Sequence, residues 1–289
     1  MKKIGFIGVG IMGKAMVRNL MKKGHEVHIY ARTPAKVQDV VSEGAVLHSS
    51  IAEAVKDRDV VISIVGGPAD VEQIYLGSQG IMENASKGAY LLDMTTSSPQ
   101  LAVKLYELGK EKGLHVMDIP VTGGDKGARD GTLSLLVGGD KDDMEAVMDV
   151  LSVLGNNINY EGPAGCGQHT KSVNQIMVAG AVAGMCEGFA YAKANGLDLA
   201  TVLKSVATGA AGSKSLDLYA DRIVKGDLQP GGYVKFLVKD LNIARHGAED
   251  SGINLVIMNS ILSQFQNMID KGMGDLGIHA LGELYQKES

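Results

Sequence analysis

The chain has 289 residues, of which 45% are hydrophobic and 21% charged, and its formal net charge at pH 7 is −5. This composition is typical of a globular protein, and the length favours two domains. A negative net charge without any basic run excludes the electrostatic surface that nucleic-acid binding requires, so we expect no nucleic-acid partner.

The sequence also argues against secretion, a membrane span and a bound metal. Glycines and Lys14 interrupt the apolar start of the chain, which therefore does not form a signal peptide. The apolar run after Lys171 is shorter than the about 20 residues that cross a bilayer. The two cysteines, Cys166 and Cys186, are too few for a disulfide framework, and the seven histidines form no metal-binding motif. We expect a cytoplasmic protein with neither a metal nor a membrane partner.

The first half of the chain alternates strand-like runs with segments of helical spacing. The helical segments include residues 12–23, 35–43 and 100–112. Strands that alternate with helices of this length predict βαβ units and a mostly parallel, doubly wound sheet of the Rossmann type. The strand-like runs are residues 3–8, 26–31, 60–65, 90–94, 115–119, 133–137 and 157–160.

After Gly165 the strand-like runs end and long helical patterns follow, broken at glycines and at Pro230. We therefore predict an α/β domain over residues 1–163 and an all-α domain over residues 164–289. The second domain opens with a long helix that links the two, and no Ser/Pro-rich linker separates them.

Gly8, Gly10 and Gly13 form a G-x-G-x-x-G pattern between the first predicted strand and the first predicted helix. Such glycines allow a tight turn, a close approach of backbone to a pyrophosphate, and close helix–strand packing. The helix N-terminus adds free N–H groups and a partial positive charge. In this context the motif predicts a dinucleotide site. We assign to it the whole turn, which is Gly8, Val9, Gly10, Ile11, Met12 and Gly13.

The residues after the second predicted strand indicate which dinucleotide binds. An NAD-selective site carries an acidic residue here, which binds the ribose 2′-hydroxyl. This chain has Ala31, followed by Arg32 and Thr33. Arg32 can pair with a 2′-phosphate, and Thr33 can donate a hydrogen bond to it. The alternative is that Arg32 is a solvated surface residue. The sequence favours NADP as the cofactor over NAD.

Lys171 and Asn174 lie three residues apart, so on a helix they share a face. A lysine at a cleft could exchange a proton with a substrate oxygen, because burial disfavours its charged form. Gly165 and Gly167 just before it suit a close approach of backbone to a ligand. The alternative is a lysine that extends to solvent from the start of a helix.

Four sequence blocks together resemble the β-hydroxyacid dehydrogenases, the family of 3-hydroxyisobutyrate dehydrogenase, tartronate semialdehyde reductase and glyoxylate/succinic semialdehyde reductases. The resemblance extends from about residue 3 to beyond residue 275, and K-D-L at 239–241 fits it as well. The blocks are G-F-I-G-V-G-I-M-G at 5–13, D-M-T-T-S-S-P at 93–99, D-I-P-V-T-G-G at 118–124 continuing to G-T-L-S-L-L-V-G-G at 131–139, and G-x-G-x-x-x-K-x-x-N at 165–174.

The resemblance implies a catalytic role for Lys171, with Asn174 as its neighbour in the substrate site. It implies that Thr122, Gly123 and Gly124 hold the substrate carboxylate, which suits the anion-binding geometry of consecutive backbone N–H groups.

The resemblance also places Val65, Thr96 and Lys239 at the cofactor and makes Asp240 the residue that orients its segment. The family implies a homodimer or homotetramer.

Three departures from the family's usual sequence bear on the substrate. Thr122 stands where Ser is usual, V-G-G at 65–67 replaces Leu-Pro-Asn, and P-G-G at 230–232 replaces P-G-F. We expect Tyr233 as a substitute for the missing aromatic side chain. Lys126, Arg129 and Lys235 are candidates for contact with a second anionic group, with a solvated position as the alternative for each.

We therefore predict an NADP-dependent oxidoreductase that interconverts a short 3-hydroxy acid, a small carboxylate substrate, and its semialdehyde, with Lys171 as general acid and base. One alternative is a decarboxylating relative of the 6-phosphogluconate dehydrogenase type, which has a much larger helical domain. Imine reductases are another, but they lack the lysine. A non-catalytic dinucleotide-binding module is a third, and it would have no need of Lys171.

Overall fold

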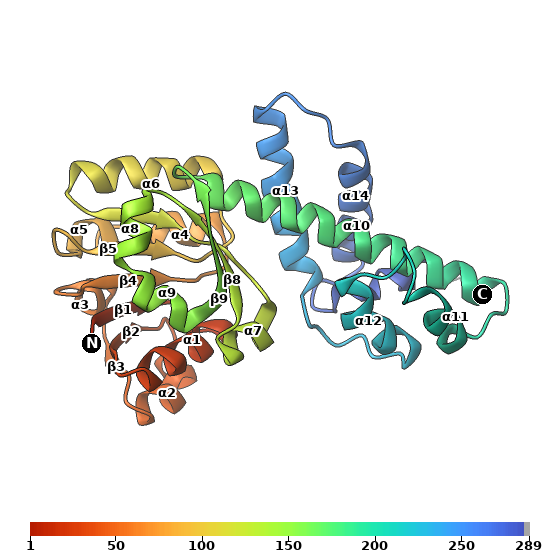
Figure 1. The fold of residues 1–289 in the computed structure, drawn as a ribbon, viewed down its shortest axis with the longest axis horizontal. Helices are drawn as coiled ribbons and strands as arrows, with labels where there is room; N and C mark the ends of the chain where they lie inside the picture. Colours follow the sequence, from red (N-terminus) through yellow and green to blue (C-terminus); the bar gives the residue numbers. More distant parts are fainter. Residues whose placement is uncertain (286–289) are drawn as a thin grey trace. The chain divides into compact units, whose positions relative to one another are not determined.

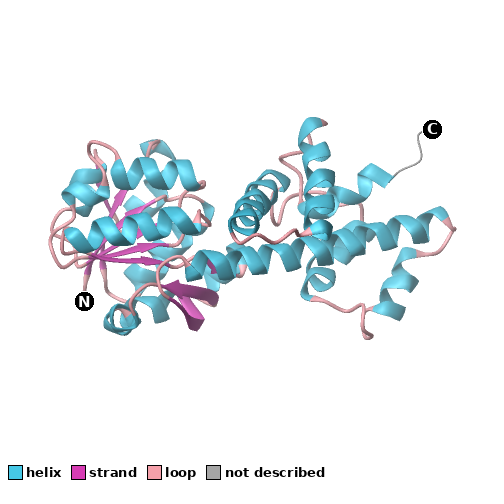
Figure 2. Ribbon diagram, turned by 90° about the horizontal axis from the view of Figure 1, so that it is seen from above, coloured by secondary structure: helices cyan, strands magenta, loops and turns pink. Residues whose placement is uncertain are grey.

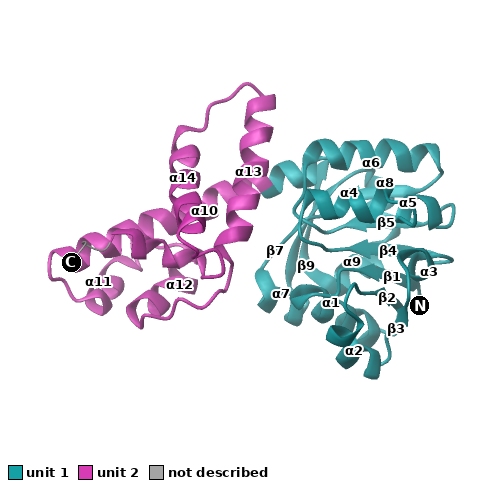
Figure 3. Cartoon of the chain, turned by 180° about the vertical axis from the view of Figure 1, so that it is seen from behind, with its two compact units in different colours: residues 1–171 teal, residues 172–289 magenta. Residues whose placement is uncertain are grey.

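The computed structural model describes residues 1–285 and divides into two compact units, Met1–Lys171 and Ser172–Ser289 (Figure 3). The predicted domains instead meet between residues 163 and 164. Helix α10 (Cys166–Ala194) accounts for this difference, because its first residues contact the α/β unit and its remainder belongs to the helical unit.

The first unit contains a nine-stranded sheet in the order β3-β2-β1-β4-β5-β6-β8-β7, with β9 also paired to β8 (Figures 1 and 2). The strands from β3 to β6 are parallel, whereas β8 is antiparallel to β6 and β7. The order 3-2-1-4-5-6 is that of the Rossmann fold, as predicted. The strands are β1 (Lys3–Ile7), β2 (Glu26–Tyr30), β3 (Val46–His48), β4 (Val60–Ser63), β5 (Tyr90–Asp93), β6 (His115–Asp118), β7 (Val121–Thr122), β8 (Leu133–Gly138) and β9 (Gly155–Gly162).

Helices cover both faces of this sheet. The predicted helix over residues 35–43 is divided into a short 3-10 turn, η1 (Pro34–Val37), and α2 (Gln38–Ser42), because the backbone at Val37 leaves the helical range. The other helices are α1 (Ile11–Lys22), α3 (Ile51–Val55), α4 (Pro68–Leu76), α5 (Ile81–Asn84), α6 (Pro99–Glu111), α7 (Gly124–Asp130), α8 (Lys141–Ala146) and α9 (Met148–Leu154).

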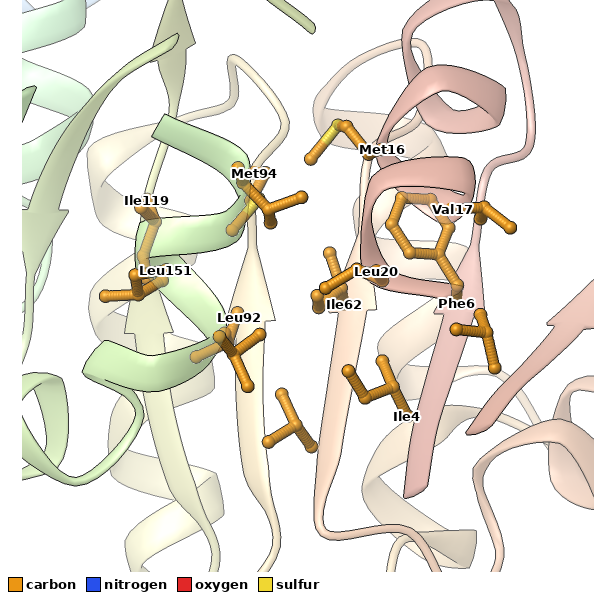
Figure 4. Close-up of a cluster of buried hydrophobic side chains, with 14 of the residues drawn as sticks. Ile4, Phe6, Met16, Val17, Leu20, Ile62, Leu92, Met94, Ile119 and Leu151 are labelled. Carbon is orange, nitrogen blue, oxygen red and sulfur yellow. The ribbon is translucent and has the colours of Figure 1, made fainter. Parts of the chain in front are cut away.

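Alternate residues of each central strand enter two separate cores. On β1, Phe6 belongs to the core that includes side chains of α1 and α9, where it lies beside Val17 of α1 (Figure 4), whereas Ile7 belongs to the core that includes side chains of α3 to α6. On β5, Leu92 and Leu91 divide in the same way. This period of two follows from strand geometry and requires both faces to be apolar in a parallel sheet. The sheet is therefore rigid where the loops at its carboxyl edge begin.

The second unit is helical, as predicted. Its core combines one face of α10 with apolar side chains of the later helices, including Phe189, Leu241 and Phe265. Among its described residues, β-type pairing is limited to one bridge between Tyr233 and Gly277. The elements after α10 are α11 (Leu199–Val206), α12 (Lys214–Val224), α13 (Val234–Asp250), α14 (Val256–Asp270) and η2 (Ile278–Tyr285).

Helix α10 corrects one expectation. The apolar run after Lys171 was expected to be too short for a membrane span, but it lies in a helix of 29 residues. By length and composition this helix could cross a membrane. Core helices of globular proteins pass the same test, and α10 contributes Ala179, Val182 and Phe189 to the core of the second unit. The cytoplasmic location stays a prediction.

Two histidines join β2 to the edge strand β3. Nδ1 of His28 lies 2.8 Å from Nε2 of His48, and Nε2 of His28 lies 2.7 Å from Oε1 of Glu26. Burial lowers the pKa of both histidines, and for His48 the proximity of His28 adds to this effect. The hydrogen bond between the two rings requires that at least one of them is neutral, because two doubly protonated rings have no acceptor nitrogen for each other.

We predict that the contribution of this histidine pair to the free energy of unfolding falls as pH drops below the ordinary histidine pKa of 6.5. The unfolded chain then binds protons before the folded chain does, at a slope of up to about 1.4 kcal/mol per pH unit for each group. Urea unfolding between pH 7.5 and 5 should show a shallower pH dependence in the double variant His28→Gln, His48→Gln. The exposed His246→Gln is the control. An unchanged slope in the double variant would show that the pair does not couple folding to pH.

Candidate active site

The three fingerprint glycines have three different environments. Gly8 has φ +99°, and an added Cβ there would lie 2.0 Å from the carbonyl oxygen of Ile64. A Cβ at Gly13 would lie 2.1 Å from the carbonyl oxygen of Gly8. A Cβ at Gly10 would meet no protein atom within 4 Å. Gly8 and Gly13 are therefore required by the turn itself, whereas Gly10 leaves an open backbone surface.

This open surface suits a phosphate group. Gly10 is the N-cap of α1, and no side chain caps that helix end. Its backbone N–H groups and partial positive charge favour an anion. The turn also lies where β1 and β4 adjoin, the topological switch point at which doubly wound sheets bind ligands. The described residues therefore fit a dinucleotide whose pyrophosphate rests on Gly10.

Arg32 and Thr33 follow β2 at the same edge of the sheet. The side chain of Arg32 is 79% exposed, and its Nη1 lies 3.3 Å from Oδ1 of Asp70 at the start of α4. An exposed ion pair of this kind contributes little to stability, so the guanidinium can exchange Asp70 for another anion. Thr33 is the N-cap of η1, but its hydroxyl makes no capping hydrogen bond.

The loop after β5 presents Thr96 outward between two buried neighbours. Thr95 accepts a hydrogen bond on Oγ1 from the backbone N–H of Val65 at 3.0 Å, and its own N–H donates to Asp93 at 3.2 Å. Thr95 and Ser97 are buried, whereas Thr96 is partly exposed. The predicted cofactor positions Val65 and Thr96 thus lie on neighbouring, mutually bonded loops.

Lys171 is buried, at 7% exposure, so its side chain does not extend to solvent. Its Nζ donates a hydrogen bond to the carbonyl oxygen of Val121, at 2.9 Å. Val121 directly precedes Thr122, and Gly123 and Gly124 follow with φ of +127° and +64°. The structure therefore brings the lysine together with the segment predicted to hold the substrate carboxylate.

The second unit holds the other predicted residues in one hydrogen-bonded group. Asn174 donates through Nδ2 to Gln175 at 2.7 Å, and Gln175 donates through Nε2 to Oδ2 of Asp240 at 2.6 Å. Nζ of Lys239 lies 2.9 Å from Oδ1 of Asp240. Asp240 thus links α13 to the helix face that carries Asn174.

Asp118, at the end of β6, is a residue of the site that the sequence did not reveal. It is 3% exposed and accepts hydrogen bonds from the backbone N–H groups of Gly165, at 2.8 Å, and Gln168, at 2.9 Å. Burial raises its pKa to about 6 against the opposing effect of these donors. Its carboxylate therefore caps the start of α10, one turn before Lys171. Its place between an apolar run and a proline was the available signal.

The packing around this cap requires its glycines, and their approach to a ligand stays a prediction. A Cβ at Gly167 would lie 2.4 Å from the carbonyl oxygen of Leu136, and Gly165 has φ +90°. The helix therefore starts in direct contact with β8.

The remaining candidates are less engaged with the site. Burial raises the pKa of the Cys166 thiol, which favours packing over reactivity. Lys126, Arg129 and Lys235 are exposed and paired with Asp130, Asp125 and Asp275. The described residues contain no group of histidine, cysteine, aspartate and glutamate suited to a metal ion.

Tyr233 packs edge-on against Phe236, with ring centroids 5.4 Å apart. A different aromatic residue stands beside Gly232, because a Cβ there would lie 3.6 Å from the Tyr219 hydroxyl. The expectation that Tyr233 replaces the missing aromatic side chain stays a prediction.

Comparison with known proteins identifies the family. The model for the NAD binding domain of 6-phosphogluconate dehydrogenase matches residues 3–162, and that for the NAD-binding region of NADP-dependent 3-hydroxyisobutyrate dehydrogenase matches residues 165–285. The chain belongs to the β-hydroxyacid dehydrogenase family. Family membership makes it an NAD(P)-dependent enzyme of the 3-hydroxyacid dehydrogenase type.

Individual relatives of the family cover nearly the whole chain. An uncharacterized oxidoreductase of Bacillus subtilis, YkwC, is 46% identical over 99% of both chains. A probable mitochondrial 3-hydroxyisobutyrate dehydrogenase-like protein of Arabidopsis thaliana is 40% identical over 96% of this chain and 84% of its own. The 2-hydroxy-3-oxopropionate reductase of Escherichia coli is 34% identical over 88% and 86%. The solved structure of Mycobacterium tuberculosis 3-hydroxyisobutyrate dehydrogenase with L-serine is 25% identical, with a TM-score of 0.91 over 99% of both chains.

The environments of the fingerprint glycines predict that alanine at position 10 weakens dinucleotide binding, whereas alanine at position 13 lowers the stability of the fold. Gly10→Ala should leave the free energy of unfolding within about 0.5 kcal/mol of the wild type, because its methyl group meets no protein atom. The same methyl group should weaken dinucleotide binding by about tenfold, or ~1.4 kcal/mol. Gly13→Ala should destabilise the fold by about 1–3 kcal/mol through overpacking. Urea unfolding and fluorescence titration with NADPH measure the two effects. Unimpaired binding by Gly10→Ala would place the pyrophosphate elsewhere.

Proposed function

We propose that this protein interconverts a short 3-hydroxy acid and its semialdehyde with NADP, and that Lys171 is the general acid and base. The observation that carries the proposal is the hydrogen bond between Nζ of Lys171 and Val121, which holds the ammonium beside Thr122–Gly124. The cofactor supplies or accepts the hydride. In the reductive direction Lys171 gives a proton to the carbonyl oxygen of the substrate, and in oxidation it takes the hydroxyl proton back.

The substrate needs a carboxylate at a fixed distance from the reacting carbon. The Thr122 hydroxyl and the N–H groups at Gly123 and Gly124 supply donors for that carboxylate at the start of α7. Because Lys171 is bonded to the residue preceding this segment, a substrate anchored there presents its oxygen to Nζ. Such orientation lowers the entropic part of the barrier. The 3-hydroxyisobutyrate and 2-hydroxy-3-oxopropionate in the relatives' names have the carboxylate and oxygen spacing that this arrangement requires.

The alternatives receive less support. The second half of the chain matches the 3-hydroxyisobutyrate dehydrogenase model rather than a larger decarboxylating domain. An imine reductase of Myxococcus stipitatus, at 20% identity and a TM-score of 0.67, is a likeness of fold alone. A module that only binds dinucleotide gives no reason for a buried lysine beside an anion-binding turn.

The preference for NADP rests on Arg32 and Thr33. Family membership does not carry it, since a relative at 30% identity is named an NAD-dependent L-serine dehydrogenase. After β2 this chain has a guanidinium and a threonine hydroxyl that does not cap η1, in place of a carboxylate. Both suit a 2′-phosphate.

A homodimer or homotetramer also stays part of the proposal. Helix α10 exposes Met177 and Tyr191, and built Cβ atoms at Gly180, Gly184 and Gly188 meet nothing within 4 Å. A helix surface with this spacing of glycines admits close approach of another helix.

The decisive experiment measures two reactions. NADPH oxidation is followed with 2-hydroxy-3-oxopropionate, succinic semialdehyde, methylmalonic semialdehyde and glyoxylate. NADP reduction is followed with L-serine and 3-hydroxyisobutyrate. Lys171→Ala should lower kcat by at least about 100-fold, because positioned proton transfer contributes 10²–10⁴. NADPH affinity, measured by fluorescence, should change little. Lys193→Ala, an exposed lysine of the same helix, is the control. Equal loss of cofactor binding and turnover would make Lys171 structural, and a fully active variant would refute its catalytic role.

Arg32→Asp should reverse the cofactor preference. A carboxylate at this position repels the 2′-phosphate and can bind the 2′-hydroxyl, so the ratio of kcat/KM for NADPH over NADH should fall by about 100-fold or more. Lys56→Asp makes the same change of charge at an exposed position before β4, at the opposite edge of the sheet. If both variants keep the wild-type ratio, Arg32 does not contact the 2′-phosphate.

A further inference from the structure

Gln168, in the first turn of α10, is a buried side chain whose carboxamide is used at both ends. It is 1% exposed. Its Oε1 accepts a hydrogen bond from the backbone N–H of Ser97, and its Nε2 donates to the carbonyl oxygen of Thr95, each at 2.8 Å. The amide therefore accepts from and donates to the loop after β5, as the backbone of a neighbouring strand would. A buried amide bonded in this way resists displacement, because leaving either end unpaired costs about 1–3 kcal/mol.

Gln168 forms hydrogen bonds with Thr95 and Ser97, which flank Thr96, the candidate cofactor contact of this loop. The opposite end of the same side chain belongs to α10, where Lys171 lies three residues further on the same helix face. One helical turn thus carries two long side chains that reach different segments of the first unit. Gln168 reaches the loop after β5, and Lys171 reaches Val121 on β7.

The start of α10 has no freedom to adjust its own position. Asp118 accepts from the N–H of Gln168 at 2.9 Å, and Gly167 has no space for even a methyl group beside Leu136 and Asp118. With the helix fixed to the sheet, the length of the glutamine side chain sets how far the Thr96 loop stands from it.

We propose that Gln168 is a positioning residue that fixes the Thr96 loop relative to Lys171, and so sets the distance between the cofactor and the proton donor. This inference rests on the proposed function, because it assumes that Lys171 acts on a substrate beside a cofactor held by that loop. Gln168 acts through its two neighbours, so its loss should lower kcat more than cofactor affinity.

Two variants test the role. Gln168→Met keeps the length of the side chain and removes both hydrogen bonds, and it should lower kcat by about 100-fold, as expected for a displacement of about 1 Å. Its Kd for NADPH should change far less. Gln168→Glu keeps the acceptor for Ser97, but an ionised carboxylate cannot donate to Thr95. Protonation restores that donor, so kcat of this variant relative to the wild type should recover as pH falls from 8 to 6.

The surroundings of the new carboxyl favour this recovery. Asp118 accepts from the N–H of residue 168 and Asp93 accepts from that of Thr95, and both negative charges favour the protonated acid. The basic residue three positions further on this helix is Lys171. Gln100→Glu introduces the same change at an exposed position just after the loop and should show neither effect.

The outcomes separate this inference from the proposed function. The positioning role is overturned if Gln168→Met has the wild-type kcat, or if it loses kcat and NADPH affinity equally. The proposed function still stands in that case, provided that turnover by the wild type depends on Lys171. If the methionine variant does not fold, the pH dependence of Gln168→Glu decides. A ratio to wild type that is constant with pH refutes the inference, and a recovery supports it. If the wild type shows no lysine-dependent turnover, the proposed function fails and the positioning role fails with it.

Discussion

The carboxylate of Asp118 fixes the start of α10, and the candidate active site of the first unit depends on that start. Burial raises its pKa to about 6. Because this folded-state pKa exceeds the ordinary value of 3.8, the ionised cap opposes folding at neutral pH, and its contribution improves as pH falls from 6 towards 3.8. The two backbone donors and the helix N-terminus offset part of the desolvation. A neutral side chain would cost less, so the charge serves the geometry of the helix start rather than stability.

The parallel sheet explains why so few residues suffice to build this geometry. The carboxyl ends of β1, β4, β5 and β6 meet at one edge, so Gly8, Val65, Thr96 and Asp118 lie close together although 110 residues separate the first from the last. The antiparallel pairing of β7 with β8 then turns the Thr122 segment back beside the start of α10. The hydrogen bond from Lys171 to Val121 joins the lysine to that segment. The fold therefore supplies the approximate arrangement, and buried hydrogen bonds set the distances.

The sequence predicted the features that depend on neighbouring residues and missed those that depend on residues far apart in the chain. The dinucleotide turn and the helical second unit rest on local patterns of glycine and apolar residues, which one sequence contains. Strands β3 and β7 have three and two residues, too short for any periodicity, and they exist because β2 and β8 offer partners. Asp118 and Gln168 were missed because their partners lie 47 to 73 residues away. The apolar run before Asp118 and the proline after it indicate the end of a buried strand, but no local pattern identifies the distant N–H groups that its carboxylate caps.

The difference between backbone contacts and side-chain contacts explains why family membership defines the reaction more firmly than the substrate. The groups assigned to chemistry are held by backbone atoms: Lys171 by the carbonyl of Val121, and the carboxylate segment by the positive φ of Gly123 and Gly124. Such contacts survive changes of neighbouring side chains. Substrate fit depends instead on side chains, and this chain departs from its family at positions such as Thr122, whose side chain has a methyl group that serine lacks. Gly232 is another such position, and a Cβ there would lie 3.6 Å from the Tyr219 hydroxyl. Side chains at such positions can therefore differ between family members that share one reaction.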